Sequence, residues 1–295
     1  MYRALLLYRR LLDSRGCPAL LKRLLSRVYG RLFESLFSDR HTRVQPYPIP
    51  VPGHAFPVTL WLDWCDYTDA LYIFKGGTGL DFPLRFALGV LRPGDVFLDV
   101  GANVGYFAIA AAMVHPGLKV LAIEPLKRNV YLVRKNVAAN SVEGVELLPL
   151  AVGTPPGERT IRHRMLNSGS PSTVGFFGEG DPLVDAFMCE ERVDVRTLDE
   201  LLDERDISTC RLAKLDVQGA ELEVLESAAR LLRERRVDYL LIEYNESAYG
   251  EKGIVESLSA FGYLPFEIQP DLSLRPVDND RLVPKRDYVF SGIEA

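Results

Sequence analysis

The sequence predicts an α/β fold, a doubly wound and mostly parallel sheet with helices on both faces. From Asp95 onwards, short apolar runs typical of buried strands alternate with longer segments of helical periodicity. One of these runs, Val96–Val100, is followed by a glycine-rich turn and then by an apolar, alanine-rich helix. This order of strand, turn and helix is found at the ligand-binding edge of doubly wound sheets.

The other elements follow from the same patterns. Apolar runs predict strands at 58–62, 119–124, 145–152, 158–164, 191–196, 211–217, 237–244, 264–269 and 286–291. Helical periodicity predicts helices at 107–114, 126–139, 220–234 and 254–261. Thr197 and Glu200 form a capping box that predicts one more short helix.

The chain before the sheet divides into two segments. Residues 1–43 repeat leucines at helical spacing with arginines between them, which predicts a basic amphipathic helical extension. This extension is either an anchor for an anionic membrane surface or partner, or a helical cap packed on the sheet. Residues 44–80 form a proline-rich linker and short-strand region, with five prolines between 46 and 57 indicating extended chain. The predicted main domain is 81–295.

The glycine-rich turn narrows the choice of ligand. Gly101, Asn103 and Gly105 form a tight turn before the helix that includes Phe107. A dinucleotide fingerprint needs glycine where this chain has Asn103 and Tyr106, and the lysine of a P-loop is missing. The turn therefore suits a ligand without a pyrophosphate or triphosphate.

Two strand-end acids point to a nucleoside with a cationic tail. Asp99 ends its strand beside the turn and is matched to a ligand amine. Glu124, followed by Pro125, lies 19 residues after Gly105, close to the roughly 20-residue spacing of a carboxylate that binds ribose hydroxyls. Ribose with an amine-bearing tail describes S-adenosylmethionine (SAM). The alternative is that both acids only sit at helix N-termini.

Four blocks of sequence resemble the FkbM family of SAM-dependent methyltransferases, over about residues 85–265: Leu98–Phe107, Ile123–Pro125, Val195–Leu202 and Ala213–Leu225. The most specific is the K-x-D-x-x-G-x-E block that starts at Lys214. The resemblance implies a class I methyltransferase fold, with a seven-stranded sheet whose last strand is antiparallel. It also implies O-methylation of hydroxyl groups on sugars, polyketides and related natural products.

The expected site lies where the predicted strands end. Asp216 is the first candidate for the base that a hydroxyl acceptor needs, followed by Glu243. Lys214 shares a strand face with Asp216 and is either catalytic or a tether for buried carboxylates. The expected cofactor contacts are Asp99, Gly101, Asn103, Gly105, Tyr106, Phe107, Glu124, Pro125 and Asp216.

Two further features bear on this site. Asp216, Glu243 and Asn245 resemble the oxygen-rich set that holds magnesium in catechol-type methyltransferases, a weak indication of Mg²⁺. The long loop at 165–190 is expected to cover the acceptor pocket, with Phe176 and Phe177 excluding water.

Charge and cysteine content limit the remaining classes. The total charge is −5, but residues 1–43 hold ten basic and three acidic side chains, so the rest of the chain carries −12. Such an acidic body argues against nucleic acid as a partner and leaves a small hydroxylated molecule as the expected acceptor. The four cysteines lack metal-site spacing, and we expect free thiols and a cytoplasmic location. The alternative function is a catalytically silent methyltransferase-fold protein that binds through its basic arm.

Overall fold

The computed structural model describes residues 44–64, 66–75, 81–164, 188–244, 253–283 and 286–292. The predicted helical extension over 1–43, most of the predicted lid at 165–190 and Asn245 lie outside the described residues.

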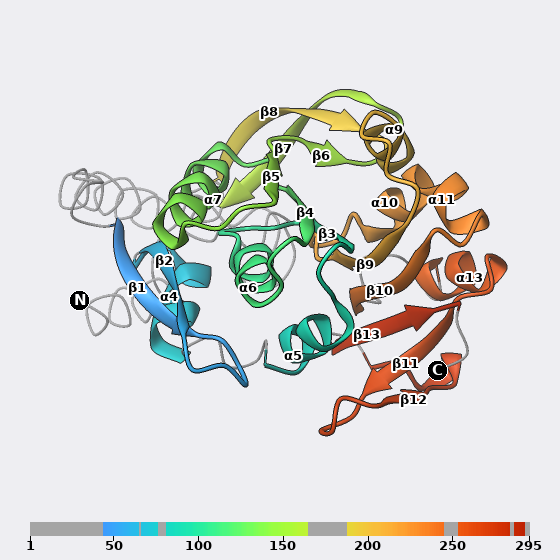
Figure 1. Ribbon diagram of the computed structural model, residues 1–295. Coiled ribbons are helices and arrows are strands. Elements are labelled where there is room, and N and C mark those ends of the chain that lie inside the picture. The colour runs from blue at the N-terminus through green and yellow to red at the C-terminus, as the bar shows by residue number, and fades with distance from the viewer. Residues whose placement is uncertain are drawn as a thin grey trace, which may run out of the picture.

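The core of the fold is an eight-stranded, mostly parallel sheet with the strand order β12-β11-β13-β10-β9-β3-β4-β5 (Figure 1). Its strands are β3 (Val96–Val100), β4 (Lys119–Ile123), β5 (Val145–Leu148), β9 (Cys210–Leu215), β10 (Val237–Tyr244), β11 (Leu264–Ile268), β12 (Leu274–Pro276) and β13 (Arg286–Ser291). β5, β4, β3, β9 and β10 pair in parallel, and β13 runs antiparallel between β10 and β11. The predicted α/β class is confirmed.

The expected number of seven strands is wrong by one. The extra strand, β12, pairs antiparallel with β11 at the sheet edge. It has three residues and ends in Pro276, so it is too short to produce an alternating pattern and carries a residue that suits only an edge strand.

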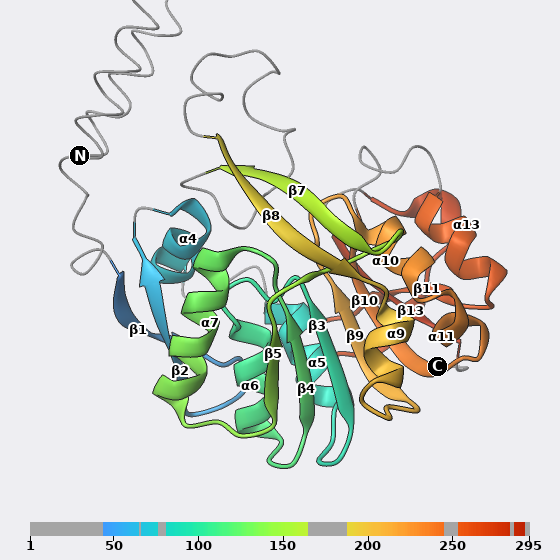
Figure 2. The ribbon, with the colours of Figure 1, turned by 90° about the horizontal axis from the view of Figure 1, so that it is seen from above.

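Two groups of helices cover the two faces of this sheet (Figures 1 and 2). The apolar core on one face includes residues of α5 (Asp81–Val90), α6 (Tyr106–Val114) and α7 (Lys127–Asn140), with α4 (Tyr67–Lys75) packed beside them. The core on the other face includes residues of α9 (Leu198–Asp203), α10 (Glu221–Ser227), α11 (Ala229–Arg233) and α13 (Gly253–Ala260). A 3-10 helix, η1 (Asn279–Arg281), precedes β13. No helix among the described residues has the length and apolar character needed to cross a membrane.

The proline-rich segment forms a strand, where the sequence suggested a linker. β1 (Val44–Pro50) pairs antiparallel with β2 (Pro57–Asp63), and the turn between them is short. Ile49 and Val51 are buried in the same apolar core as α6. The segment therefore belongs to the packed body of the protein. We call this two-stranded sheet the β1–β2 ribbon.

The backbone hydrogen bonds of the ribbon explain why it tolerates so many prolines. Pro48 lies opposite Thr59, and the N–H and C=O of Thr59 point away from β1, to the side-chain amide of Asn140 on α7 (2.8 Å each). Trp61 likewise donates its N–H to Asn136 (2.6 Å). Because these positions do not bond across the ribbon, the prolines opposite them lose nothing by lacking an N–H.

α4 is fixed over the sheet by buried acids. Asp69, which is fully buried, forms an ion pair with Arg128 on α7 and also accepts the N–H of Asp63 (2.8 Å). Burial raises the pKa of Asp69 to about 7, and the positive charge of Arg128 opposes that rise. These bonds connect the end of β2, the start of α4 and the first turn of α7.

The strand predicted at 145–152 is two strands in different sheets. β5 ends at Leu148, and β6 (Ala151–Val152) joins β7 (Gly157–Arg164) and β8 (Met188–Arg196) in a separate sheet of order β6-β8-β7. Pro149 stands at the break, where its missing N–H cannot continue the β5 ladder. β7 and β8 form a long antiparallel pair that rises from the main sheet (Figure 2).

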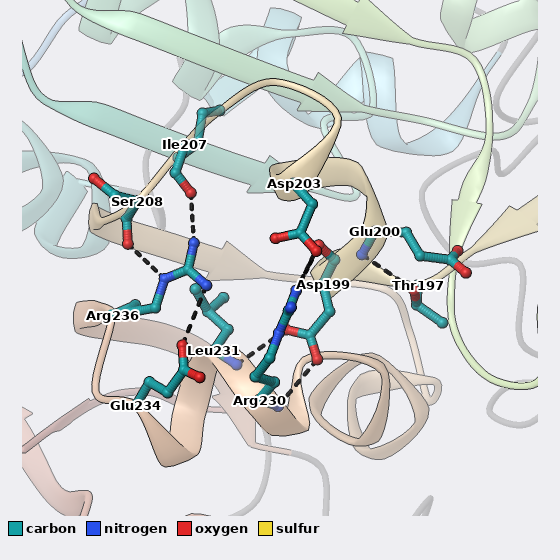
Figure 3. Close-up of polar contacts among 10 residues, drawn as sticks. All are labelled: Thr197, Asp199, Glu200, Asp203, Ile207, Ser208, Arg230, Leu231, Glu234 and Arg236. Carbon is teal, nitrogen blue, oxygen red and sulfur yellow. Dashed lines mark hydrogen bonds and ion pairs between the residues drawn. The ribbon is translucent and has the colours of Figure 1, made fainter.

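The helix predicted at 220–234 is also divided, into α10 and α11. The carboxylate of Asp199, on α9, accepts two backbone N–H groups in the first turn of α11, at 3.0 and 2.9 Å (Figure 3). A residue distant in sequence therefore caps α11 and starts a new helix there. The capping box is confirmed, since Thr197 Oγ1 accepts the N–H of Glu200 at 3.3 Å (Figure 3).

Candidate active site at the ends of the parallel strands

The glycine-rich turn joins β3 to α6 beside the end of β9. Gly101 has φ +82°, and a Cβ at this position would lie 2.0 Å from the carbonyl oxygen of Asp216. Only glycine permits that approach. Gly105, with φ +86°, occupies the N-cap position of α6. The turn thus brings the start of α6 and the end of β9 to the same edge of the sheet.

Asp99 lies at the end of β3 with 1% of its surface exposed. Its Oδ2 accepts the N–H of Ala108 in α6 (3.2 Å), and its Oδ1 lies 3.5 Å from Lys214 Nζ. Burial raises the pKa of this carboxyl, and the charge of Lys214 opposes the rise. Asp99 therefore connects α6 to the sheet through one oxygen and faces Lys214 with the other.

Glu124, 4% exposed, joins the turn to the neighbouring strand. Oε2 accepts the N–H of Asn103 and Oε1 accepts the N–H of Leu126, each at 2.9 Å. Burial raises its pKa to about 7, while the hydrogen bonds from Leu126 and Asn103 act in the opposite direction. The acid expected to bind ribose thus has a structural task as well, because it fixes Asn103 in a left-handed conformation (φ 53°).

The residues around the turn fit the groups that SAM would present. Among the described residues, Asp99 Oδ1 and Asn103 Oδ1 are buried oxygens without a hydrogen-bond partner. Buried acceptors are normally satisfied, and SAM carries an ammonium group and ribose hydroxyls that can donate. Glu124 and the half-buried Pro125 directly follow the end of β4.

Tyr106 and Phe107, both expected to contact the cofactor, place their side chains in the core. The Tyr106 hydroxyl donates to the carbonyl oxygen of Pro50 in the ribbon, and its ring packs edge-on against Tyr72 at 5.5 Å. The Phe107 ring is buried, with its centroid 5.2 Å from Lys214 Nζ. These rings support the turn from below, so only their backbone atoms are available to a ligand there.

Lys214 joins two of the predicted carboxylates. It is 8% exposed, and its Nζ lies 3.2 Å from Asp216 Oδ2 and 3.5 Å from Asp99 Oδ1. Burial alone would lower the pKa of Lys214, but Asp216 and Asp99 outweigh it and raise the pKa above its usual value. The two carboxylates therefore favour the charged form of Lys214. Of the two roles considered, the geometry supports the tether.

Asp216 and Glu243 lie side by side at the ends of β9 and β10. Gln218 Nε2 donates to Asp216 Oδ1 (2.7 Å) and to Glu243 Oε2 (3.0 Å). The Asp216 side chain is 34% exposed, so it can reach a ligand. Both candidate acids are thus together and accessible.

The loop after Asp216 is held by Glu221 at the start of α10. Its carboxylate accepts the N–H of Val217 (2.9 Å) and the N–H of Gly219 (3.0 Å). This fixes Gln218 at φ 55° with its amide between the two acids. The last glutamate of the K-x-D-x-x-G-x-E block thus shapes the site through its backbone.

The weak indication of magnesium receives no support. Within the described ranges, no three His, Cys, Asp or Glu side chains are arranged so that they could hold a metal ion. Asn245, the third member of the suggested set, lies outside those ranges.

Two residues at the site had no signal in the sequence. Tyr72, on α4, is half-buried, and the charges of Lys214, Asp216, Asp69 and Asp99 all act on its hydroxyl, whose pKa burial raises. Asp287, on β13, stands directly opposite Glu243 across the β10–β13 pair. Both are brought in by tertiary pairing, and neither belongs to a recognisable motif.

The fold and this site define a class of protein. A parallel sheet with one antiparallel strand inserted near its end, a glycine-rich turn after β3 and an acid at the end of β4 are the features of a class I methyltransferase fold. The family model described as "Methyltransferase FkbM domain" matches residues 99–268. That is more than half of the chain, which belongs to the FkbM methyltransferase family.

Individual relatives agree with this family. The chain is 29% identical over 156 residues to the 31-O-demethyl-FK506 methyltransferase FkbM of Streptomyces tacrolimicus, a match covering 46% of this chain and 60% of that protein. It is 26% identical to Methyltransferase 1 of Beauveria bassiana, covering 45% and 58%. The chain thus spans less than two thirds of the length of both relatives. Among solved structures, M. jannaschii TYW2 in complex with AdoMet is 14% identical, with coverage of 84% and 85% and a TM-score of 0.42.

Proposed function

We propose that this protein is a SAM-dependent O-methyltransferase whose acceptor is a hydroxyl group of a sugar, polyketide or related natural product. The observation that carries the proposal is the bond between Glu124 and the N–H of Asn103, which sets the acid expected to bind ribose against the glycine-rich turn. Within the described residues the Oδ1 atoms of Asp99 and Asn103 beside it accept no hydrogen bond, which supports a ligand rich in donors.

The choice of oxygen as the accepting atom rests on chemistry and on one relative. The name of the Streptomyces tacrolimicus protein describes methylation of an O-demethyl compound. In this chain, accessible carboxylates stand at the strand ends beyond the turn. A hydroxyl must lose its proton when it is methylated, and carboxylates can take it.

The roles of the chain's own residues follow from their places. When bound, SAM supplies an electrophilic methyl group. Glu124 and the turn would hold the ribose, Asp99 and Asn103 the polar tail, and Asp216 with Gln218 would orient the acceptor. Alignment of the acceptor with the methyl group can account for much of the acceleration.

We also propose that the protein acts in the cytoplasm on a small molecule. Cys189 and Cys210 are free thiols, as expected in a reducing compartment. The charge of −12 over residues 44–295 would repel a nucleic-acid backbone.

The test is transfer itself. The purified protein is incubated with isotopically methyl-labelled SAM and a panel of hydroxylated sugars and polyketides, and products are sought by mass spectrometry. We expect at least one acceptor to gain a single labelled methyl group, on oxygen. Methylation only on nitrogen or carbon would overturn O-transfer. Cofactor binding without transfer to any acceptor would favour the silent binding protein.

A further inference from the structure

Three carboxylates lie in one row across the edge of the sheet. β9 and β10 pair in parallel up to Leu215 and Ile242, so Asp216 and Glu243 follow at the same level. Glu243 in turn is the direct partner of Asp287 across the antiparallel β10–β13 pair. Neighbouring strands are about 4.8 Å apart, so the row spans roughly 10 Å.

These three carboxylates lie on the same face of the sheet as the ion pair between Asp99 and Lys214, beside the glycine-rich turn. Side chains two residues apart on a strand point to the same face, so Asp216 shares the face of Lys214. Lys214 reaches Asp99 on that face, and Glu243 and Asp287 continue it because directly opposite residues project to the same side. Asp287 is half-buried and so remains accessible.

The Glu243–Asp287 pair is unfavourable for the fold alone. Like charges directly opposite on neighbouring strands destabilise a sheet. Gln218 relieves Glu243 and Asp216 by donating to both, whereas the Asp287 side chain has no hydrogen-bond or ion-pair partner within the described part of the chain. The positive charge of Lys214 acts on Asp287 and lowers its pKa. Because this arrangement does not favour the fold, we attribute the acid at position 287 to a function.

The protonation of Asp287 fits a base. Burial, and after it the negative charges of Asp216 and Glu243, raise its pKa to about 7, while the charge of Lys214 opposes them. A carboxyl with a pKa near the working pH can both accept and release a proton during turnover.

We propose that Asp287 is the base that takes the proton of the acceptor hydroxyl, with Glu243 as the positioning residue that keeps it basic. The inference rests on the proposed function. As the O–H bond breaks, its proton goes to a carboxylate oxygen of Asp287. The hydroxyl oxygen forms the new bond to the methyl carbon, and the electron pair of the broken carbon–sulfur bond remains on sulfur. Residue 287 lies outside the stretch matched by the family model, 99–268.

The first test needs no cofactor. An acid whose pKa is raised from 3.8 to about 7 on folding makes the folded state bind more protons between these values. Its favourable contribution is therefore present below pH 4 and is lost as pH rises to 7. In the full-length apo protein, Asp287→Asn should raise the melting temperature at pH 8 relative to wild type and change it less at pH 5.

The second test is turnover with an identified acceptor. Asp287→Asn should reduce kcat by ~10²-fold or more, with the affinity for S-adenosylhomocysteine (SAH) within a few-fold of wild type. Glu243→Gln removes the like charge, so it should move the acid limb of the kcat–pH profile to lower pH. A matched control is Asp238→Asn, at the other end of β10, where Asp238 pairs with Arg211 (2.7 Å); the profile should not move.

The outcomes separate the two proposals. A fall in melting temperature at pH 8 for Asp287→Asn would make Asp287 structural, and undiminished kcat would remove it from catalysis; either result overturns the inference. If the wild-type protein binds no SAH, the proposed function is wrong. There is then no methyl transfer in which Asp287 could act as the base, whatever the melting curves show.

Discussion

Glu124 shows how one side chain can serve both the fold and the ligand. Its two oxygens accept the N–H groups of Asn103 and Leu126, on two separate turns. A ribose hydroxyl would have to share these oxygens, which each have a second lone pair. We therefore treat Glu124 as the residue where cofactor affinity and local stability are coupled.

Glu124→Gln tests this coupling. A glutamine keeps the shape but has one acceptor oxygen, so one of the two N–H groups loses its partner at a cost of about 1–3 kcal/mol. We expect a lower melting temperature and at least ~10-fold weaker SAH binding by calorimetry. Glu146→Gln, which removes an exposed ion pair with Arg205, is the control. Normal SAH affinity in Glu124→Gln would place the ribose elsewhere.

Asp216 is the first candidate for the base in the sequence. In the structure its two oxygens accept hydrogen bonds from Lys214 and Gln218. Asp216→Asn leaves Lys214 with Asp99 as its remaining carboxylate partner. Because Asp216 is partly exposed, we expect a stability loss of only about 1 kcal/mol, with a moderate fall in kcat. Unchanged stability with a ~10²-fold loss of kcat would return the base to Asp216.

The predictable part of the site is the part carried by local sequence. Asp99, the turn glycines and Glu124 follow from a strand, a turn and a spacing, all within short stretches of chain. Tyr72 and Asp287 join the site only through tertiary pairing, such as the register that sets Asp287 against Glu243. No spacing along the chain encodes that register.

At the scale of elements, the β1–β2 ribbon is attached to the rest of the fold by two asparagines of α7. Asn140 accepts the N–H of Thr59 and donates to its C=O, so it satisfies both polar groups of one residue. In turn, the carbonyl oxygen of Pro50 in the ribbon accepts a hydrogen bond from the hydroxyl of Tyr106, which follows the glycine-rich turn. We expect the ribbon to influence cofactor binding through this contact.

Asn140→Ala should show that influence. Two partly buried backbone groups would lose their partner, with an expected cost of about 1–3 kcal/mol in the free energy of unfolding, measured by urea titration. SAH binding should weaken as well, because the ribbon supports Tyr106. Arg134→Ala, at an exposed position of the same helix, should change neither. An Asn140→Ala protein of normal stability would mean that the amide clamp contributes little.

The predicted limits of helices and strands were wrong where residues distant in sequence determine them. The strand at 237–244 was predicted with its observed limits from a run that is apolar except for two acidic residues. The helix at 220–234 also has a continuous pattern, yet Asp199 from α9 caps a new helix inside it (Figure 3). Likewise, the prolines of β1 suggested a linker. They fit a strand because the backbone groups opposite them bond to an asparagine of α7, and that asparagine lies about 80 residues away in sequence.

At the scale of the whole molecule, the stretch matched by the family model does not contain every residue of the candidate site. The matched stretch 99–268 holds the turn, Glu124 and Asp216. The flanking parts provide the ribbon, Tyr72 on α4 and Asp287 on β13. Segments before and after the matched stretch therefore complete the site, and we expect acceptor specificity to depend on them.

The basic segment 1–43, with its net charge of +7, is the whole-molecule feature that stays a prediction. If the segment is a helical cap, its removal should lower the melting temperature of the protein or cause precipitation. If it is a membrane anchor, its removal should abolish binding to anionic vesicles and leave SAH binding intact. We expect the first result, measured by thermal denaturation and vesicle co-sedimentation. Recovery of a stable, soluble truncated protein would count against the cap.

We propose above all that the site binds SAM through its nucleoside and its amino-acid tail. Calorimetric titration of the full-length protein with SAH, and separately with NAD, tests it most directly. The turn has Asn103 where a pyrophosphate needs glycine, and Asp99 would repel phosphate. We predict that SAH binds and raises the melting temperature, while NAD does neither. Tighter binding of NAD than of SAH would contradict the account.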